Sequence, residues 1–302
     1  MRRRPTTRTR VDGGATRFAP APTGWLHLGH VANAIFVWGL ARVTGRRVLL
    51  RIEDHDRQRS RPEFDAGILE DLDWLGFRAD EGPVRQSDAG HVYAATLEML
   101  RFNGFVYACD CSRTTFAEWA RRHGRSWSEG GCPGGCRGRP VAEGRGVGLR
   151  VALGGGEERW TDLRLGPGGD APDREGDPLV RDRAGNWTYP FCVVVDDARQ
   201  EIDLVVRGED LLDATARQIR LGRLLGRSAP PAWYHHPLIR RPDGSKLSKS
   251  AGDSGVRELR AAGMSPEFVL GRAAAAVGLL DRERAISATD VMTHVAFTET
   301  GR

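Results

Sequence analysis

The chain has 302 residues, of which 40% are hydrophobic and 28% charged, a balance that is typical of a folded globular protein and excludes a disordered one. The 45 Lys and Arg residues against 40 Asp and Glu give a formal net charge of +5, which is compatible with a nucleic-acid partner without establishing one. No run approaches the roughly 18 consecutive apolar residues of a membrane span, so we expect no membrane partner. We expect a cytoplasmic location because the N-terminal segment lacks the apolar core of a secretory signal.

The first ten residues carry five arginines, and we expect residues 1–15 to form a basic flexible arm. A solvated tail, an RNA-contacting extension and a targeting peptide all fit this composition. A secretory signal does not fit, because its apolar core is missing.

In chain order, residues 16–100 alternate between apolar strands and amphipathic helices. A strand is predicted around Arg17 to Ala19, and a buried strand from Val48 to Ile52. Between them a helix is predicted that ends at Thr44 and Gly45 and has Val31, Ile35, Val37 and Leu40 on its buried side. Two further helices are predicted from Phe64 to Trp74 and from Val92 to Leu100. This order, with its continuous apolar strands, predicts an α/β fold with a parallel sheet covered on both faces.

Residues 101–187 differ in character because they hold most of the cysteines and many glycines. We expect them to form an insertion in a sheet domain that spans residues 16–240. Strands from Phe191 to Val195 and from Ile202 to Val206 are predicted to resume the core, and residues 256–280 are predicted to be helical.

Four of the five cysteines lie close together in the sequence, as Cys109, Cys111, Cys132 and Cys136. Two pairs of thiols about 20 residues apart match the spacing of four ligands on one ion. Four thiolates leave no open coordination position, so the pattern favours a structural, tetrahedral Zn²⁺ over free thiols or disulfides. Cys192 lies in an apolar run and is predicted to be a small buried residue.

His27, Gly29 and His30 stand where a strand and turn lead into a predicted helix. The N–H groups and the positive end of the helix dipole favour a bound phosphate there, and two imidazoles three residues apart can face the same anion. Gly29 leaves room for a flat ring against the backbone. Histidines that only cap the helix are the alternative interpretation.

Lys246 and Lys249 belong to a polar Lys-Leu-Ser-Lys-Ser segment near the start of residues 241–302, which we expect to be a helical C-terminal region. Two ammonium groups beside small hydroxyl residues suit a polyphosphate, whose growing charge they could neutralise. A solvated basic surface loop is the alternative.

The two motifs follow each other in this order about 220 residues apart. Together they resemble the HIGH and KMSKS signatures of the class I aminoacyl-tRNA synthetases. Arg17 to Gly24 (RFAPAPTG) is similar to the opening of the glutamyl-tRNA synthetases, usually RFAPSPTG. Arg51 to Asp54 (RIED) and Val205 to Asp210 (VVRGED) are similar to two later segments of that group. The resemblance covers most of the chain.

Within this group the chain is most similar to the glutamyl-Q tRNA(Asp) synthetases, short paralogues with the catalytic and zinc modules but no anticodon-binding domain. Three features favour them: the chain stops soon after the KLSKS segment, Tyr189 to Asp197 (YPFCVVVDD) resembles their YNLAVVVDD, and the zinc motif ends in a cysteine. The resemblance implies a Rossmann-type catalytic domain interrupted by a zinc-containing insertion.

The resemblance also implies an activity, the activation of L-glutamate by ATP, which is accompanied by Mg²⁺. His27, His30, Lys246 and Lys249 would be the catalytic residues, and His27, Gly29, His30 and Lys249 would bind ATP. The implied glutamate-binding residues are Arg17, Phe18, Ala19, Pro20, Ala21, Glu53, Tyr189 and Arg207, with both arginines making bidentate contacts and Glu53 accepting from the α-ammonium. Ala21 replaces the family's usual serine.

The implied acceptor is queuosine at the wobble position of tRNA(Asp), and we expect a monomer. Two alternatives stay open: a truncated glutamyl-tRNA synthetase that charges the tRNA 3′ end, and a nucleotidyltransferase that acts on small molecules through an HxGH motif. A non-catalytic RNA-binding module is a fourth possibility, which the intact motifs disfavour.

Other features are given structural interpretations. Trp233 to Pro237 is predicted to be a strand at the rim of the site, and the paired acids Asp196 and Asp197 are predicted to be ordinary caps at a strand end. Judged without the resemblance, Arg51 and Glu53 are charges at a strand end, and Tyr189 is a core residue.

Overall fold

The computed structural model describes residues 13–122, 132, 134–239 and 255–300. Its central sheet has two parts: β3-β2-β1, and β9-β10-β6-β7. The two parts meet where Ala15 of β1 pairs in parallel with Ile202, and where the amide of Asp203 donates to the carbonyl of Ala15 at 3.0 Å. The strands are β1 (Ala15–Phe18), β2 (Arg47–Ile52), β3 (Glu81–Arg85), β6 (Glu158–Asp162), β7 (Gly166–Asp170), β9 (Leu204–Gly208) and β10 (Ala232–His236).

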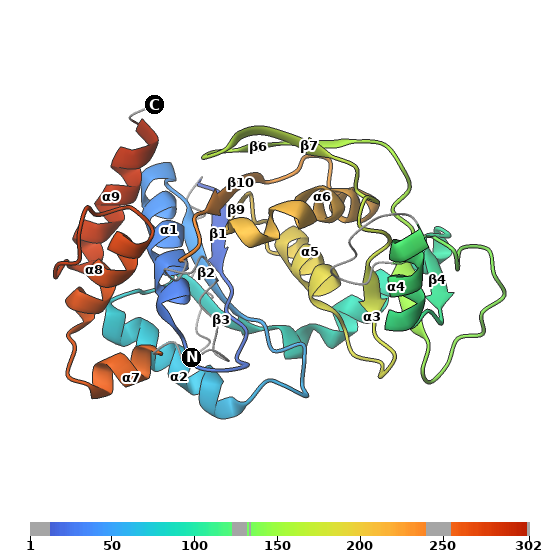
Figure 1. Ribbon diagram of the computed structural model, residues 1–302, viewed down its shortest axis with the longest axis horizontal. Helices are drawn as coiled ribbons and strands as arrows, with labels where there is room; N and C mark the ends of the chain where they lie inside the picture. The colour runs from blue at the N-terminus through green and yellow to red at the C-terminus, as the bar shows by residue number, and fades with distance from the viewer. Residues whose placement is uncertain (1–12, 123–131, 133, 240–254, 301–302) are drawn as a thin grey trace, which may run out of the picture.

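All of these strands run parallel except β7, which is antiparallel to β6. The sheet is covered on both faces, as predicted (Figure 1). One face packs on α1 (Leu28–Thr44) and α2 (Pro62–Leu75), and the other on α5 (Tyr189–Arg199) and α6 (Thr215–Leu224). The side chains of each strand therefore alternate between two cores.

This alternation decides which polar residues can meet. Leu204 and Val206 of β9 lie in the core under α1, so Val205 and Arg207 project from the opposite face, toward α6. The same reasoning puts Arg17 of β1, Arg51 of β2 and His235 of β10 on that face. Three arginines and a histidine from four neighbouring strands thus share one side of the sheet.

A second, antiparallel sheet of β4 (Val106–Cys109), β5 (Gly148–Val151) and β8 (Leu179–Arg181) lies beside the parallel one. It packs with α3 (Gly90–Phe102) and α5, and the cysteine-rich segment with α4 (Arg113–Arg122) adjoins it. Strands β6 and β7 fall within residues 101–187 of the sequence but join the main sheet through β10. The segment expected to be an insertion therefore contributes two strands to the domain that it interrupts.

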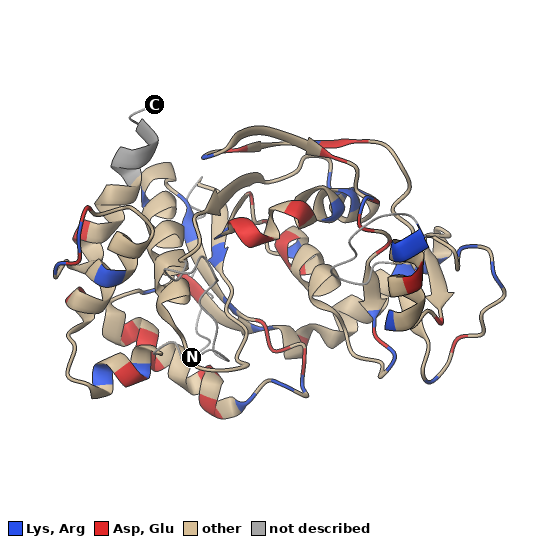
Figure 2. Ribbon diagram, in the orientation of Figure 1, with Lys and Arg blue, Asp and Glu red and all other residues tan. Residues whose placement is uncertain are grey.

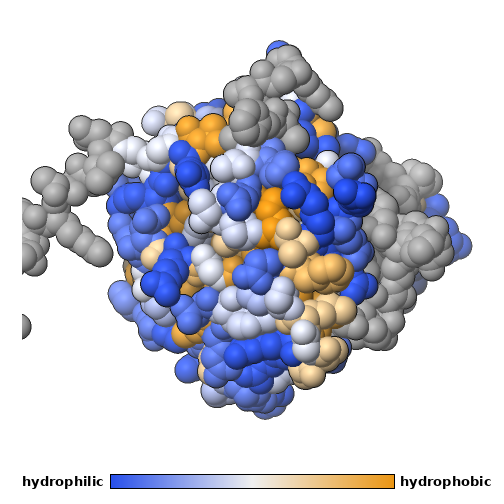
Figure 3. All heavy atoms as spheres, turned by 90° about the vertical axis from the view of Figure 1, so that its left-hand side faces the viewer, coloured by the Kyte–Doolittle hydropathy of each residue, from blue (hydrophilic) through white to orange (hydrophobic). Residues whose placement is uncertain are grey.

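The helical part after residue 255 is confirmed as α7 (Val256–Ala261), α8 (Pro266–Ala276) and α9 (Ala288–Thr300). These helices lie against α1 and α2 at one end of the molecule (Figure 1). Gly39 permits the close approach of α1 and α9, because a Cβ atom there would come within 2.7 Å of Val295. Seen from this end, Figure 3 shows hydrophilic residues mixed with smaller hydrophobic areas.

Both signs of charge are interspersed along the described chain (Figure 2). Within the described ranges, no helix is long and apolar enough to cross a membrane. The basic arm expected over residues 1–15 falls mostly outside the described residues.

One predicted strand is wrong. The segment from Phe191 to Val195 belongs to helix α5, which begins at Tyr189 with Pro190 in its first turn. All five residues are buried, so this part of the helix is covered on every side. A helix buried all round has the same continuous apolar pattern as a buried strand, and Pro190, which suits a helix start, was the signal that separated them.

Candidate active site

The candidate site lies where the order of the strands reverses. From β1 the chain proceeds to β2 on one side, and β9 lies on the other. In parallel sheets, ligands bind beyond the carboxyl ends of the strands at such a switch point. Arg17 stands one residue before the end of β1, and Arg207 one residue before the end of β9.

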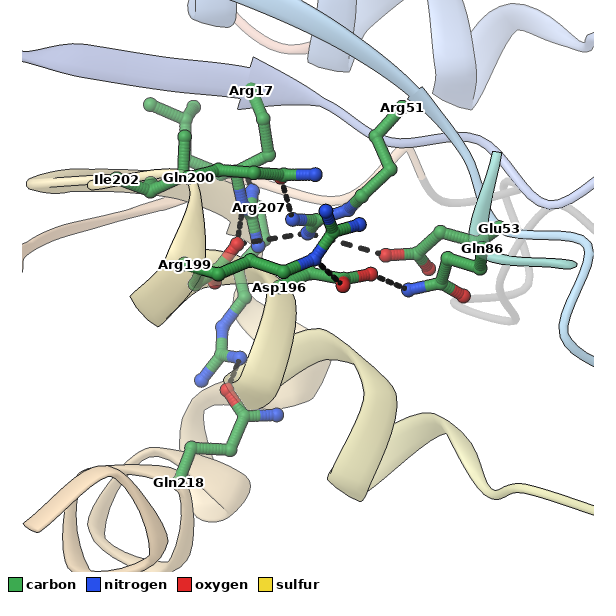
Figure 4. A network of polar contacts seen from close by, with 12 residues as sticks. Arg17, Arg51, Glu53, Gln86, Asp196, Arg199, Gln200, Ile202, Arg207 and Gln218 are labelled. Carbon is green, nitrogen blue, oxygen red and sulfur yellow. Dashed lines mark hydrogen bonds and ion pairs between the residues drawn. The ribbon is translucent and has the colours of Figure 1, made fainter. Parts of the chain in front are cut away.

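Five ionisable residues, which we call the carboxylate cluster, surround the ends of β1 and β2: Arg17, Arg51, Glu53, Asp196 and Asp197. Figure 4 labels the first four of them. The Nε of Arg17 donates to Asp197 Oδ1 at 3.1 Å, and the Nη2 of Arg51 donates to the same oxygen at 2.8 Å. The Nη2 of Arg51 also reaches Glu53 Oε1 at 3.4 Å. Two cations from adjacent strands therefore share one carboxylate from α5.

The charges of this cluster set its protonation. Burial by itself would lower the pKa of Arg51, but the neighbouring carboxylates, Asp197 first, outweigh it and raise that pKa above its ordinary value. Burial would raise the pKa of Asp197, and the two arginines hold it below its usual range instead. Glu53 behaves differently, because burial outweighs its arginine neighbours and raises its pKa to about 7.

Asp196 and Asp197 are not caps at a strand end, so that prediction is wrong. Both are buried in the last turns of α5. Asp196 Oδ2 accepts from Tyr93 Oη at 2.9 Å and from Gln86 Nε2 at 2.8 Å, and its Oδ1 accepts from Arg199 at 2.7 Å. Reading the segment as a strand hid this role. The adjacent buried acids in an apolar run were the signal that could have shown it.

Arg207 is held by a different kind of partner. Its Nε donates to His235 Nε2 at 3.0 Å, its Nη1 to Gln218 Oε1 at 2.6 Å, and its Nη2 to Thr215 Oγ1 at 2.8 Å and the carbonyl of Leu211 at 3.0 Å. All four acceptors are neutral groups. Burial, helped by the like charge of Arg17, lowers the pKa of Arg207 to about 10 against the opposing effects of Tyr189 and Asp197.

The hydrogen bonds also limit what each arginine can offer a ligand. A guanidinium carries five N–H groups. Contacts with described residues engage four of them in Arg207, the fifth is on Nη1, and the guanidinium also interacts with the hydroxyl of Tyr189. In Arg17 the described contacts are Nε to Asp197 and Nη1 to the carbonyl of Val206, which leaves three. Arg17 can therefore grip a carboxylate with two N–H groups, and Arg207 can do so only by giving up an existing bond.

The structure brings together the four charged or hydroxyl residues of the implied glutamate site. Tyr189 begins α5, and its pKa is raised by burial and by the negative charge of Glu53, while Arg207 and Arg17 oppose the shift. Phe18 points the other way, into the core beside Trp38 at 5.3 Å between ring centroids. Its side chain therefore does not face the site. Pro20 fixes the next turn, because its carbonyl accepts from the amide of Glu53 at 3.0 Å.

The HLGH motif opens helix α1 as predicted. His27 is the N-cap, its Nδ1 accepts from the amide of Gly29 at 3.1 Å, and the amide of His27 donates to His30 Nδ1 at 3.1 Å. The two rings lie 4.0 Å apart between centroids. A Cβ atom on Gly29 would come within 2.9 Å of the His27 ring, so glycine permits this packing. The capping arrangement and the paired imidazoles at a helix N-terminus are both present.

Lys246 and Lys249 lie outside the described residues. The chain that follows them returns to the HLGH motif, because Gly255 pairs with His27 and the amide of Val256 donates to the carbonyl of Leu26 at 2.8 Å. Arg257 then stacks over the ring of Trp25 at 4.1 Å. Residue 255 is thus fixed next to the start of α1, six positions after Lys249.

The four clustered cysteines are brought together. Their sulfur atoms all lie within 4.8 Å of one another, and Cys111 and Cys136 are 3.2 Å apart. Sulfurs around a tetrahedral ion with metal–sulfur bonds of about 2.3 Å would be about 3.8 Å apart, so the donor set fits such an ion.

The fifth cysteine, Cys192, is buried in a different core from the other four, as predicted. The strand predicted before residue 237 is confirmed as β10.

The chain matches the family "tRNA synthetases class I (E and Q), catalytic domain" at residues 15–130 and 154–296. It is 42% identical to a protein of Symbiobacterium thermophilum named glutamyl-Q tRNA(Asp) synthetase, over 88% of this chain and 87% of that one. It is also 42% identical to glutamate–tRNA ligase 1 of Rubrobacter xylanophilus, over 84% of this chain but 51% of that one. The crystal structure of glutamate-tRNA synthetase from Elizabethkingia anophelis shares the fold, with a TM-score of 0.74, 24% identity, and coverage of 93% of this chain and 65% of that one. The chain therefore belongs to the class I tRNA synthetases of the glutamate and glutamine group, and within it to the short glutamyl-Q tRNA(Asp) synthetase family, whose members are ligases.

Proposed function

We propose that this protein activates L-glutamate with ATP and transfers the glutamyl group to queuosine at the wobble position of tRNA(Asp). The observation that carries the first half is the setting of Arg207, a buried cation whose hydrogen-bond acceptors are neutral. Such a charge is costly unless an anion joins it. A substrate carboxylate supplies that anion.

The glutamate site divides the work among residues of opposite charge. Arg17, with three uncommitted N–H groups, binds one carboxylate in a bidentate fashion, and Arg207 contributes its remaining N–H. Glu53 in its ionised form accepts from the α-ammonium group, which in turn favours that form. Tyr189 adds a hydroxyl donor. Ala19, Pro20 and Ala21 line the turn after β1, and Phe18 contributes through its backbone only.

The reaction joins an oxygen of the substrate α-carboxylate to the α-phosphorus of ATP and breaks the bond to the bridging oxygen, so pyrophosphate leaves. Catalysis of this kind depends on positioning and on stabilising charge. His27 and His30, with the N-terminus of α1, hold the phosphates, while Gly29 leaves room for the nucleotide. Lys246 and Lys249 neutralise the departing pyrophosphate. When bound with ATP, Mg²⁺ neutralises further phosphate charge.

The composition of the chain gives separate support to the two lysines. Of its 45 basic residues, only Lys246 and Lys249 are lysines. Arginine serves at every other basic position, so lysine is retained only within this motif. A compact ammonium group on a flexible stem can follow a phosphate as it moves, whereas a planar guanidinium favours a fixed bidentate partner.

Zn²⁺ is the metal that we propose for Cys109, Cys111, Cys132 and Cys136. Arg139 stands beside the site, with Nη1 at 3.5 Å from Cys136 Sγ, so its positive charge would offset part of the negative charge of four sulfur ligands. Four sulfur ligands would leave no position for a substrate, so the ion would hold the loops together and take no part in the chemistry.

The RNA group that accepts glutamate, queuosine, is the more specific part of the proposal. Support comes from the relatives named glutamyl-Q tRNA(Asp) synthetase, which this chain matches over most of their length. A glutamyl-tRNA synthetase that charges the 3′ end is the second candidate, because the chain is equally similar to one half of a glutamate–tRNA ligase. The two share the same activation step.

Lysine-selective acetylation tests the nucleotide site directly, because the chain offers only two lysine side chains. ATP with Mg²⁺ should slow the acetylation of both lysines, read by mass spectrometry, while GTP should not. Equal rates of acetylation with and without ATP would contradict the proposal.

Labelled glutamate tests the acceptor. After incubation with ATP and tRNA(Asp) that carries queuosine, digestion to nucleosides should place the label on queuosine. The matched control is the same tRNA with guanosine at the wobble position, which should take up no label. Label on the terminal adenosine in both RNAs would favour the second candidate.

A further inference from the structure

Asp162, His235 and Arg207 form a line of hydrogen bonds behind the glutamate site. Asp162 Oδ2 lies 2.5 Å from His235 Nδ1, and Arg207 Nε donates to His235 Nε2 at 3.0 Å. The side chains of Asp162 and His235 are 1% and 0% exposed. The three residues come from β6, β10 and β9, which are neighbours in the sheet.

The order of these contacts fixes the proton on the imidazole. Arginine can only donate, so the Nε2 of His235 must carry a lone pair toward Arg207. The single ring proton of a neutral imidazole is then on Nδ1, where it donates to Asp162. Burial lowers the pKa of His235, which agrees with a neutral ring. A protonated imidazole would point an N–H at the N–H of Arg207.

Asp162 is itself held in place by the backbone. Its Oδ1 accepts from the amides of Arg164 and Leu165, both at 2.9 Å, and its Oδ2 accepts from the amide of His235 at 3.1 Å. Trp233 stacks on the His235 ring at 5.9 Å, and the Arg207 guanidinium lies over the same indole at 4.5 Å. The orientation of Arg207 is thus tied to a fixed turn between β6 and β7.

We propose that Asp162 and His235 are positioning residues for glutamate recognition: Asp162 selects the Nδ1–H tautomer of His235, and that tautomer orients Arg207 so that its remaining N–H faces the substrate. Neither residue touches the substrate. This inference rests on the proposed role of Arg207 in glutamate binding. It also gives β6, which the sequence places inside the insertion, a part in the site.

Asp162→Asn is the substitution that separates positioning from packing. If the amide oxygen keeps the two backbone donors, the NH₂ group faces His235 and donates to Nδ1. The ring proton must then move to Nε2, where it opposes the N–H of Arg207. The size of the side chain is unchanged, the direction of the hydrogen bond to His235 Nδ1 is reversed, and the backbone amide of His235 loses its acceptor. Asp170→Asn on β7, where Asp170 is partly exposed and pairs with Arg174, is the matched control.

The tautomer can be measured without any substrate. Long-range ¹H–¹⁵N spectra of the full chain, with His235 assigned through His235→Gln, should show an unprotonated Nε2 in the wild-type protein and a protonated Nε2 in Asp162→Asn. A wild-type His235 with its proton on Nε2, or a charged ring, would overturn the inference whatever the enzyme activates.

Kinetics supply the second readout. Loss of a buried hydrogen bond to a charged group predicts that Asp162→Asn raises the KM for glutamate by about 10- to 100-fold. The KM for ATP should stay near the wild-type value, as in Asp170→Asn, whereas the melting temperature should fall in Asp162→Asn because the buried amide of His235 loses its acceptor. His235→Gln, which keeps an acceptor for Arg207, should bind glutamate more tightly than His235→Leu does. Equal KM values for the Gln and Leu variants would overturn the inference, even if Asp162→Asn did not fold. Absence of glutamate-dependent exchange in the wild-type protein would instead count against the proposed function.

Discussion

Arg51 and Arg207 project from the same face of one sheet, and both are buried, yet the groups around them differ in charge. Arg51 contacts two carboxylates directly, at 2.8 Å and 3.4 Å, and its pKa is raised. Arg207 contacts an imidazole, an amide, a hydroxyl and a carbonyl, and its pKa is lowered to about 10. The fold neutralises the first cation and leaves the second without a direct counter-charge.

This difference indicates that Arg51 stabilises the fold, whereas Arg207 is placed to bind an anionic ligand. Removing a cation that neutralises buried carboxylates leaves those carboxylates uncompensated, so stability should fall. Removing a cation held by neutral groups leaves no buried charge behind, so binding of an anion should suffer more than folding does.

Arg51→Met should have the largest effect, a loss of about 3 to 5 kcal/mol in the free energy of unfolding, because Asp197 and Glu53 lose a buried partner. Urea denaturation measures this loss. The control is Arg78→Met, which removes an ion pair with Asp73 whose side chains are 86% and 74% exposed, and should change stability very little. Equal effects in the two variants would remove the structural half of the comparison.

Arg207→Met should lower kcat/KM for glutamate by about 100-fold, or about 2.7 kcal/mol of transition-state stabilisation. Its free energy of unfolding should fall by less than that of Arg51→Met. Pyrophosphate exchange at varied glutamate concentration and urea denaturation measure the two quantities. A variant that unfolds as readily as Arg51→Met but activates glutamate normally would reverse the comparison.

The pKa of Glu53 predicts how the free energy of unfolding depends on pH. Its pKa is about 7 in the folded protein against 4.5 as the ordinary value, so the folded state holds more protons than the unfolded state between these values. The stabilising contribution is present at low pH and is lost as pH rises toward 7, which amounts to a loss on the order of 2 kcal/mol between pH 5 and 7. Glu53→Gln should remove this slope from the denaturation series.

Asp71→Asn is the control for that series, because burial also raises the pKa of Asp71, to about 6, on a helix away from the glutamate site. Both variants should flatten the dependence of stability on pH. Only Glu53→Gln should abolish the improvement in glutamate KM as pH rises through 7. An unchanged KM profile in Glu53→Gln would exclude its role in binding the ammonium group.

The cysteine cluster should show the smallest effect on activation. Cys111→Ser should bind much less zinc than the wild-type protein and loosen the surrounding loops, because it removes one of the four proposed ligands. Glutamate-dependent exchange should stay within about twofold of wild type, a change below 0.5 kcal/mol, because the cluster packs in a separate core. Stoichiometric zinc in this variant would contradict the ligand assignment.

Local patterns predicted much of the molecule. The apolar strands, the helix that begins at the HLGH motif and the four cysteines each depend on residues near one another in sequence. The partnership of Arg17 with Asp197 spans 180 residues, and that of Asp162 with His235 spans 73. No local pattern encodes such pairings. Because the segment before Asp197 was predicted to be a strand and not α5, Asp197 was placed at a strand end and was not predicted to be a buried ion-pair partner.

The donors of Arg207 show a second limit of sequence reasoning. The motif around Arg207 implied a bidentate grip on a carboxylate, and residue type alone supported it. The structure commits four of its N–H groups to neutral acceptors, because α6 and β10 surround it closely. The type of residue was enough to predict that Arg207 belongs to the site. The number of N–H groups that Arg207 can offer a ligand could be learned only from the structure.

Amino-acid selectivity tests the central claim most directly, since a buried cation without a direct counter-charge should distinguish a carboxylate from an amide of the same shape. ATP–pyrophosphate exchange by the wild-type protein should require L-glutamate and should fall by at least about 100-fold with L-glutamine. Equal exchange with the two amino acids, or exchange that needs neither, would contradict the assignment of Arg207 and its neighbours as a glutamate site.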